Sequence, residues 1–436
     1  MKYYCIGIKG TGMSTLAQIL YDLGNEVFGY DDMKDYKYTQ DGLEERKIKI
    51  YYDNEHEIDK DTIVTYSVAF KEDHKEIQRV KKLGLTIKPY GEIMADVVNK
   101  FSTVGVSGTH GKTSTCSLIK QILDDNGGCN YFIGAGDGKA SYDNEYYVVE
   151  SDEFNRHFLN YHPRYSIITS LEEEHMEIYE DIEDIIKTFE KFANQTKELV
   201  IANGDNENIR KIKFKTKVIF YGFNDNNDIV IKNDKYDNKN SIFDLYLDGK
   251  LLGNFKLPLF GKHMVLDATA AIAFCNYIGV DLKVITKALK KFVNSKRRFE
   301  IKETIDDTII VDDYGHHPTE IKVTLEAAHQ RYPDKKIVVV FRPNTYSRIR
   351  DFCDNFVDAL EVADKVYLTE VVANREKQED YPGITTHMIG DKIKDSEFVD
   401  EDTVSVLEKE KGSVVMFMGC ADNSHLIENY TKLLKG

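Results

Sequence analysis

The chain has 436 residues, of which 42% are hydrophobic, and a formal net charge of −16. This length suffices for two to four domains with their own cores and excludes a small disulfide-stapled scaffold. The negative charge argues against nonspecific binding to nucleic acid or to an anionic membrane, because their phosphates would be repelled. Six cysteines without C-x-x-C spacing predict reduced thiols rather than disulfides or a zinc site.

No apolar run approaches the roughly 18 residues that a membrane helix needs. The N-terminus leads directly into a predicted strand at residues 2–8 rather than into a signal peptide. We therefore expect a soluble cytoplasmic protein, a monomer or homodimer, with no membrane or nucleic-acid partner.

Short β-branched runs alternate with helix-period segments, which is typical of parallel α/β sheets. The runs lie at residues 2–8, 63–66, 101–106, 147–150, 166–169, 308–311, 337–341, 365–368 and 413–418. We expect three α/β domains, at residues 1–99, 100–295 and 296–436. Residues 222–240 are rich in Asn and Asp and predict turns within a β-rich insertion of the second domain.

A glycine turn follows the first strand run and opens a helix over residues 14–23. Its candidate diphosphate-binding residues are Gly7, Lys9, Gly10, Thr11, Gly12, Met13 and Ser14, with Asp31 after the next strand. This order is typical of a dinucleotide-binding fold, but the spacing G-x-x-G-x-G differs from the nicotinamide fingerprint. A glycine turn at a helix N-terminus binds any diphosphate, so UDP, NAD and a purely structural turn all remain open at this point.

A second glycine-rich segment follows the strand run at 101–106 and has the features of an ATP phosphate loop. It consists of Gly108, Thr109, His110, Gly111, Lys112, Thr113 and Ser114. Glycines let backbone N–H groups turn onto phosphate oxygens, and a helix N-terminus adds partial positive charge. Lys112 would reach the β- and γ-phosphates, and Thr113 would ligate Mg²⁺.

Acidic residues follow the strand run at 147–150. A carboxylate at the carboxyl end of a parallel strand near a phosphate loop is well placed to hold Mg²⁺. We assign that role to Glu150, with Glu153 as a second candidate.

The third domain supplies candidate cations and a candidate base. Arg298, in a K-R-R-F segment, suits phosphate binding because a guanidinium binds through two parallel hydrogen bonds. Asp313 and His316 lie after the strand run at 308–311, among two acids and two adjacent histidines. A histidine that is neutral near pH 7 can accept a proton from an amine.

Three segments, Gly7 to Ser14, Gly108 to Ser114 and Asp312 to Glu320, together resemble the Mur ligase family in order and spacing. The resemblance covers essentially the whole chain. It implies a Rossmann-like UDP-binding domain, a central P-loop ATPase domain and a Rossmann-like C-terminal domain. It also implies an ADP-forming ligation through an acyl phosphate, with ATP, UDP-N-acetylmuramate and L-alanine as substrates and Mg²⁺ as cofactor.

The resemblance gives roles to further residues. It makes His175 a metal ligand, places His263 beside the adenine, and makes Arg348 a clamp for a carboxylate or acyl phosphate. Lys112, Asp313, His316 and Arg348 would form the catalytic group, with His316 and Asp313 orienting or deprotonating the incoming amine.

Several positions depart from the family pattern. They are Ser170 and Glu174 near the second metal, Met264 and Asp267 near the adenine, and Arg342, Asn344 and Thr345 at the amino-acid end. These departures leave open a related ligase that adds another amino acid or a peptide, and a non-catalytic nucleotide-binding homologue. A nicotinamide dehydrogenase would explain the first glycine turn but not the second.

Overall fold

The computed structural model describes residues 1–67, 69–134, 136–373 and 376–436. Among these residues, no helix has both the length and the apolar character needed to cross a membrane. The first of two compact units consists of Met1–Lys232, Asp244–Gly253 and Leu266–Leu289. The second consists of Asn233–Phe243, Asn254–Val265 and Lys290–Gly436.

The first sheet is parallel throughout, in the order β3-β2-β1-β4-β5. Its strands are β1 (Lys2–Ile6), β2 (Glu26–Tyr30), β3 (Lys49–Tyr51), β4 (Thr62–Tyr66) and β5 (Thr86–Ile87). The helices of this part are α1 (Thr11–Asp22), α2 (Asp41–Glu45), α3 (Lys75–Lys82) and α4 (Tyr90–Val98), with a short 3-10 helix, η1 (Tyr38–Gln40). Tyr4, Ile6 and Val64 of the sheet form a core with Ile77 and Val80 of α3.

The second sheet has ten strands in the order β15-β14-β13-β12-β11-β10-β6-β9-β7-β8. They are β6 (Ser102–Ser107), β7 (Asn130–Ile133), β8 (Asp137–Lys139), β9 (Tyr146–Glu150), β10 (Tyr165–Ile168), β11 (Leu199–Asn203), β12 (Val218–Gly222), β13 (Ile229–Tyr236), β14 (Ser241–Leu247) and β15 (Lys250–Leu257). The helices are η2 (Phe154–Asn160), α5 (Lys112–Asp124), α6 (Ile182–Gln195), α7 (Glu207–Arg210), α8 (Lys262–Tyr277) and α9 (Leu282–Lys290). β6 lies between β9 and β10 and is parallel to both, which places its carboxyl end and theirs at one edge.

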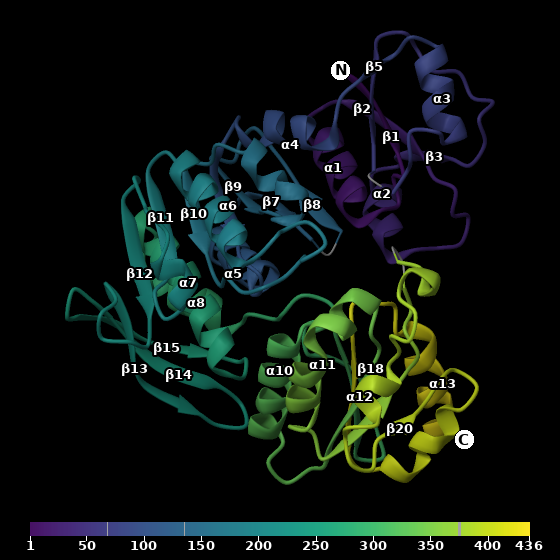
Figure 1. Ribbon diagram of the computed structural model, residues 1–436. Coiled ribbons are helices and arrows are strands. Elements are labelled where there is room, and N and C mark those ends of the chain that lie inside the picture. The colour runs from purple at the N-terminus through teal and green to yellow at the C-terminus, as the bar shows by residue number, and fades with distance from the viewer. Residues whose placement is uncertain (68, 135, 374–375) are drawn as a thin grey trace. The chain divides into compact units, whose positions relative to one another are not determined.

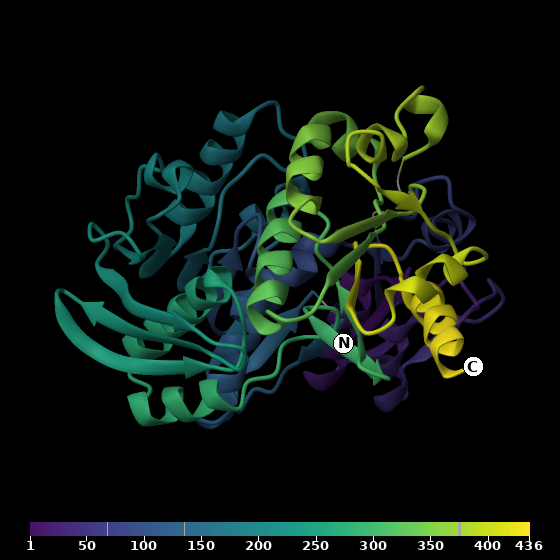
Figure 2. The same cartoon turned by 90° about the horizontal axis from the view of Figure 1, so that it is seen from below.

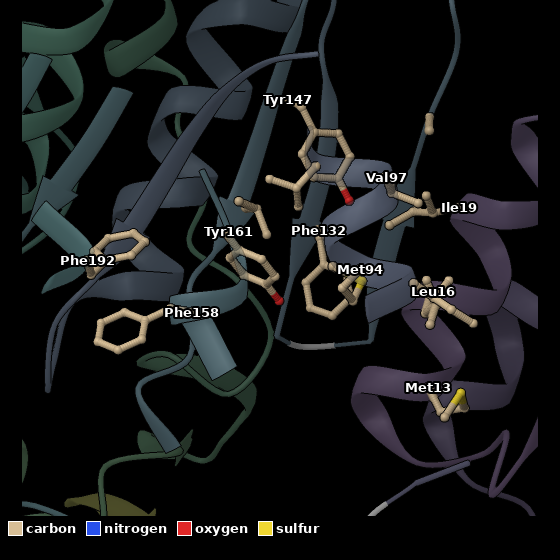
Figure 3. Close-up of a cluster of buried hydrophobic side chains, with 14 of the residues drawn as sticks. Met13, Leu16, Ile19, Met94, Val97, Phe132, Tyr147, Phe158, Tyr161 and Phe192 are labelled. Carbon is tan, nitrogen blue, oxygen red and sulfur yellow. The ribbon is translucent and has the colours of Figure 1, made fainter. Parts of the chain in front are cut away.

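A single buried cluster joins α1 and α4 to the second sheet (Figure 3). It contains Met13, Leu16 and Ile19 of α1, Met94 and Val97 of α4, Phe132 of β7 and Tyr147 of β9. Because these side chains share one core, the first compact unit includes both of the first two predicted domains. The predicted domain limits therefore stay a prediction.

The third sheet lies in the second unit, in the order β16-β17-β21-β18-β19-β20. Its strands are β16 (Glu300–Ile305), β17 (Thr308–Asp313), β18 (Ile337–Phe341), β19 (Lys365–Leu368), β20 (Glu397–Phe398) and β21 (Val414–Met418), with only β16 antiparallel to its neighbour. The helices are α10 (Pro318–Arg331), α11 (Tyr346–Leu360), α12 (His387–Gly390), α13 (Ser424–Lys435), η3 (Gln378–Asp380) and η4 (Val404–Glu410). Figures 1 and 2 show α10 and α13 on opposite faces of this sheet, each over its own core.

The predicted α/β class is confirmed, and each predicted strand run overlaps a strand. The prediction for residues 222–240 is only partly right, because β13 occupies Ile229–Tyr236. Its first residues Ile229, Val230 and Ile231 are all buried, and that burial favours a strand over the turns that Asn and Asp predict.

Candidate active site

The ATP loop predicted from Gly108 to Ser114 connects β6 to α5. Gly108 and Gly111 have φ values of 141° and 80°, which residues with a side chain rarely adopt. Gly111 precedes the first residue of α5 and makes no side-chain cap. The first intrahelical bond is donated by Thr115 N–H to Gly111 O, so the N–H groups of Lys112, Thr113 and Ser114 have no partner within the helix. This end of α5 can therefore bind an anion.

Ser170 braces this loop from the end of β10. Its Oγ accepts a hydrogen bond from His110 N–H at 2.7 Å, and its carbonyl accepts one from Thr109 N–H at 3.1 Å. The Thr109 hydroxyl accepts one from Glu172 N–H at 3.0 Å, and the His110 ring lies 3.6 Å from the Glu172 carboxylate. Ser170, noted in the sequence only as a departure from the family pattern, thus fixes the shape of the loop.

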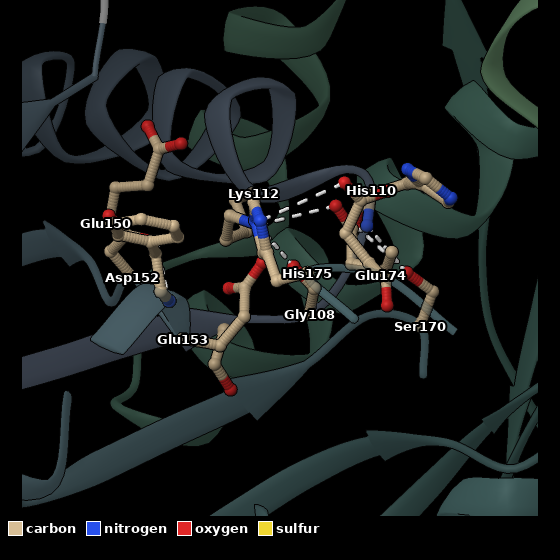
Figure 4. Close-up of polar contacts among 12 residues, drawn as sticks. Gly108, His110, Lys112, Glu150, Asp152, Glu153, Ser170, Glu174 and His175 are labelled. Carbon is tan, nitrogen blue, oxygen red and sulfur yellow. Dashed lines mark hydrogen bonds and ion pairs between the residues drawn. The ribbon is translucent and has the colours of Figure 1, made fainter. Parts of the chain in front are cut away.

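Lys112 lies at the first turn of α5, and its ammonium lies between the loop and Glu153 (Figure 4). It donates to the carbonyls of Gly108 and Thr109 and forms an ion pair with Glu153 at 2.8 Å. Burial by itself lowers the pKa of Lys112, but Glu153, Asp152 and Glu150 outweigh burial and raise it well above its usual value. The group is therefore a fixed positive charge at neutral pH.

Thr113 and Glu150 come together as predicted for metal ligands. The Thr113 hydroxyl donates to both oxygens of Glu150 at 3.1 Å. Gly134 N–H donates to Glu150 Oε2 at 2.8 Å. Glu153 Oε2 is buried and has no hydrogen-bond partner among the described residues. The hydroxyl of Thr113 and the carboxylates of Glu150 and Glu153 are hard oxygen donors, and one oxygen of Glu153 is unsatisfied. This donor set fits a magnesium ion.

His175 has a φ of 57°, packs edge-on against Phe154 and lies 3.4 Å from Glu177 Oε1. Burial lowers the pKa of His175, but the hydrogen bond to Glu177 and the charges of Glu174 and Glu153 raise it above its usual value. The role of His175 as a metal ligand stays a prediction.

Lys9 of the first glycine turn and Asp31 after β2 make contacts that stabilise the fold. Lys9 is 1% exposed, and its ammonium donates to the carbonyls of Met33 at 2.9 Å and Asp35 at 2.6 Å. Asp31 accepts from the N–H groups of Lys9 and Met33 at 2.9 and 3.0 Å. These contacts hold residues 33–35 against the turn. The binding of UDP by Lys9 and Asp31 stays a prediction.

The side chains of Met13 and Ser14 are also turned inward, because Met13 is in the core and the Ser14 hydroxyl donates to Thr39 O at 2.5 Å. Gly7 has a φ of 77°, and a Cβ there would collide with Phe70. Helix α1 has no side-chain cap at Gly10, and its first intrahelical bond is donated by Ser14 N–H to Gly10 O. The N–H groups of Thr11, Gly12 and Met13 thus remain as donors for a diphosphate.

In the second unit, Asp313 organises the segment that carries Arg298. Its carboxylate accepts from Phe299 N–H and Gly315 N–H, both at 2.7 Å. Burial raises the pKa of Asp313, while Arg298 and these N–H groups oppose the rise. Arg297 and Phe299 both have positive φ, so Asp313 holds a strained segment on either side of Arg298.

His316 lies against the carboxylate of Glu320, and its predicted action with Asp313 on the incoming amine stays a prediction. The Nδ1 of His316 is 3.4 Å from Glu320 Oε2 and 3.1 Å from Tyr314 O. Glu320 also accepts from His316 N–H at 3.1 Å and completes a capping box with His317 at the start of α10. Arg298 lies 3.6 Å from Glu320 Oε1. Glu320 was part of the motif but was not predicted as the carboxylate that orients His316.

His263 and Arg348 lie in the second unit as well. Burial, with the charge of Arg298, lowers the pKa of His263 to about 4, so this imidazole is neutral near pH 7. Its Nδ1 is buried and has no hydrogen-bond partner among the described residues. Arg348, in the first turn of α11, donates to Asn344 Oδ1 at 3.2 Å and Thr345 Oγ1 at 3.3 Å. Asn344 and Thr345 were both noted as departures from the family pattern.

Three family models match successive parts of the chain: "Mur ligase family, catalytic domain" at residues 2–102, "Mur ligase middle domain" at 106–275 and "Mur ligase, glutamate ligase domain" at 297–421. The UDP-N-acetylmuramate–L-alanine ligase of Ligilactobacillus salivarius is 40% identical over 433 residues, which are 99% of this chain and 97% of the relative. The chain belongs to the Mur ligase family.

Further relatives agree with this assignment. The enzyme of the same name from Lacticaseibacillus casei is 41% identical over 99% of this chain and 98% of its own length. The structure of a UDP-N-acetylmuramate–alanine ligase from Thermotoga maritima matches with a TM-score of 0.83 and 25% identity, over 100% of this chain and 99% of that one. A murein peptide ligase from Psychrobacter arcticus shares the fold, with a TM-score of 0.71 and 21% identity over 100% and 98% of the two chains.

Membership of the Mur ligase family confirms the predicted three-domain α/β architecture and excludes the dehydrogenase alternative. Two supporting residues, Ser170 and Gly134, were not predicted. Ser170 could have been found from register, because Ile168 of β10 pairs with Ser107 immediately before the loop. Gly134 gives no such signal in the sequence.

Proposed function

We propose that this protein joins L-alanine to the lactyl carboxylate of UDP-N-acetylmuramate in peptidoglycan synthesis, with ATP converted to ADP and phosphate. ATP phosphorylates the carboxylate, and the α-amine of L-alanine attacks the acyl phosphate and expels phosphate. The observation that carries this proposal is the full-length match to ligases of that name at 40 and 41% identity.

Residues of the first unit would bind ATP and transfer its phosphoryl group. Phosphoryl transfer needs alignment and charge neutralisation more than covalent help from the protein. The N–H groups at the start of α5 would bind phosphate oxygens, and Lys112 would place its fixed charge on the transferring group. The ion pair with Glu153 keeps the ammonium beside the loop.

Thr113, Glu150 and His175 would hold Mg²⁺, and Glu153 has an oxygen to spare for it. When bound, this ion supplies positive charge against the negative charge that develops on the phosphates. Glu150 is the last residue of β9, and Thr113 lies in the first turn of α5. These two elements hold both side chains beside the loop.

The amine end of the reaction would use residues of the second unit. Arg298 and Arg348 would contribute guanidinium groups for phosphate or carboxylate oxygens. His316, oriented by Glu320, would accept the proton of the incoming ammonium. Neutral His263, with its unsatisfied Nδ1, would pack beside the adenine.

ADP release should be measured with UDP-N-acetylmuramate and each amino acid in turn. The proposal predicts release that requires both UDP-N-acetylmuramate and L-alanine, with glycine and L-serine accepted poorly, because one methyl group discriminates by only about 1–3 kcal/mol. A tripeptide should be tested too, since a UDP-N-acetylmuramate:L-alanyl-γ-D-glutamyl-meso-diaminopimelate ligase is 26% identical over 68% of this chain and all of its own, with a TM-score of 0.59. Faster ADP release with the tripeptide than with L-alanine would show that the tripeptide, and not L-alanine, is the substrate.

A further inference from the structure

The hairpin of β7 and β8 is clamped to helices α1 and α2 by Arg46. The Arg46 guanidinium forms two parallel bonds to Asp22, at 2.8 and 2.9 Å. It also donates to Gln18 Oε1 at 3.1 Å and to Gly138 O in β8 at 3.0 Å. Every one of these contacts lies within the first unit.

Gln18 and Asp22 contact the hairpin directly as well. Gln18 Nε2 donates to Gly136 O at 2.9 Å, and Asp22 Oδ2 accepts from Ala140 N–H at 3.3 Å. Gly138 packs so closely on α1 that a Cβ would lie 2.5 Å from Thr15 Cγ2. Phe132 of β7 lies in the same buried cluster as Ile19 of α1 (Figure 3). The hairpin is therefore fixed to the helix whose N-terminus is the first glycine turn.

The other side of the hairpin contacts the candidate metal site. Gly134, directly after β7, donates its N–H to Glu150 Oε2 at 2.8 Å. The hydroxyl of Thr113, in helix α5, donates to the same carboxylate oxygen. A carboxylate at the end of a strand can rotate about its side-chain torsions. A hydrogen bond from a backbone N–H to a carboxylate oxygen is strong, so it can fix the orientation of the carboxylate.

We propose that Gly134 is a positioning residue that orients Glu150 toward the metal ion, and that Arg46 keeps Gly134 in place by anchoring the hairpin to α1. This inference rests on the proposed function only in taking Glu150 as a metal ligand. Loss of a hydrogen bond to a metal-binding side chain commonly lowers the affinity for the metal by about 10–100-fold.

Gly134 offers a clean test because it does not have a positive φ, so alanine brings no left-handed backbone strain. The added Cβ would lie 2.8 Å from Glu150 Oε2 and 3.1 Å from its carboxyl carbon, which pushes the carboxylate away. Gly91→Ala is a matched control: Gly91 also lacks a positive φ, and its Cβ would lie 3.0 Å from the Asn160 amide, in contact with no candidate ligand.

Manganese binding to the full-length protein should be measured by EPR, with ADP present, for wild type, Gly134→Ala, Arg46→Met and Gly91→Ala. We expect Gly134→Ala to weaken Mn²⁺ binding by about tenfold or more, Arg46→Met to weaken it in the same direction, and Gly91→Ala to bind as wild type does. Thermal melting of each variant accompanies the titration, since loss of packing alone would lower stability without shifting the Mn²⁺ midpoint.

Unchanged Mn²⁺ affinity in Gly134→Ala would overturn the role of Gly134. Weakening in Gly134→Ala with wild-type affinity in folded Arg46→Met would overturn the anchoring role of Arg46. The ADP-release assay with wild-type protein is run in parallel. Failure of that assay while wild type binds Mn²⁺ would count against the proposed reaction and leave the positioning result standing.

Discussion

Two lysines lie beside glycine turns in this chain, and their surroundings give them opposite roles. Lys9 and Lys112 each donate to two backbone carbonyls, but only Lys112 also forms an ion pair with a carboxylate, that of Glu153. A carbonyl pair neutralises no charge, so Lys9 stabilises a loop. Because a carboxylate partner can be exchanged for phosphate oxygens, we expect Lys112 to be available for ATP.

Replacement of Lys112 by alanine should lower kcat by about a thousandfold, because a preorganised charge at a phosphoryl transition state contributes roughly 3–4 kcal/mol. Steady-state kinetics with thermal melting checks this. Lys120→Ala is the control, since Lys120 is in the same helix and pairs with Asp124. Substantial activity in Lys112→Ala with normal melting would count against the phosphate-loop assignment.

The lowered pKa of His263 predicts how stability depends on pH. Its pKa falls from the usual 6.5 to about 4 through burial and the charge of Arg298. Between pH 6.5 and 4 the unfolded chain therefore binds a proton that the folded chain does not. The contribution of His263 to stability is complete above pH 6.5 and falls on acidification by at most about 1.4 kcal/mol per pH unit.

Melting temperatures between pH 4.5 and 7 should therefore decline less steeply in His263→Gln than in wild type. His425→Gln is the control, because His425 is exposed on α13 and should follow the wild-type curve. Parallel curves for His263→Gln and wild type would show that His263 does not titrate as its burial implies.

At the scale of elements, the phosphate loop owes its shape to the end of β10. Ser170→Ala removes the acceptor of His110 N–H, and an unsatisfied backbone donor costs about 1–3 kcal/mol. We expect the KM for ATP to rise by roughly tenfold with a small change in melting temperature. Ser141→Ala is the control, since Ser141 Oγ accepts from Asp143 N–H in an exposed turn. An unchanged KM for ATP in Ser170→Ala would remove Ser170 from the loop's support.

The elements that carry the site could be predicted because their signals are local. Both glycine turns follow a β-branched run and open a helix, and Glu150 closes a strand next to β6. The partners of the side chains could not be predicted, because they come from distant segments. Glu153 meets Lys112 across 41 residues, and Gly138 meets Arg46 across 92. Residues 222–240 show the same limit, because burial of Ile229 and Ile231 depends on neighbouring strands.

At the scale of the whole molecule, the two helices that open from a glycine turn, α1 and α5, lie in one compact unit with a continuous core. The candidate cations and base, Arg298, Arg348 and His316, belong to the other unit. The proposed reaction therefore depends on both units. It assigns the diphosphate and the transferring phosphate to the first, and the activation of the amine to the second.

The most direct test of this account follows the oxygens of the substrate. UDP-N-acetylmuramate labelled with ¹⁸O in both oxygens of its lactyl carboxylate is incubated with ATP, Mg²⁺, L-alanine and the protein, and phosphate and amide product are analysed by mass spectrometry. An acyl phosphate retains one carboxylate oxygen in the bond to phosphorus. We therefore predict one ¹⁸O in each phosphate released and one in the new amide carbonyl. Unlabelled phosphate, or phosphate released without amide formation, would contradict the account.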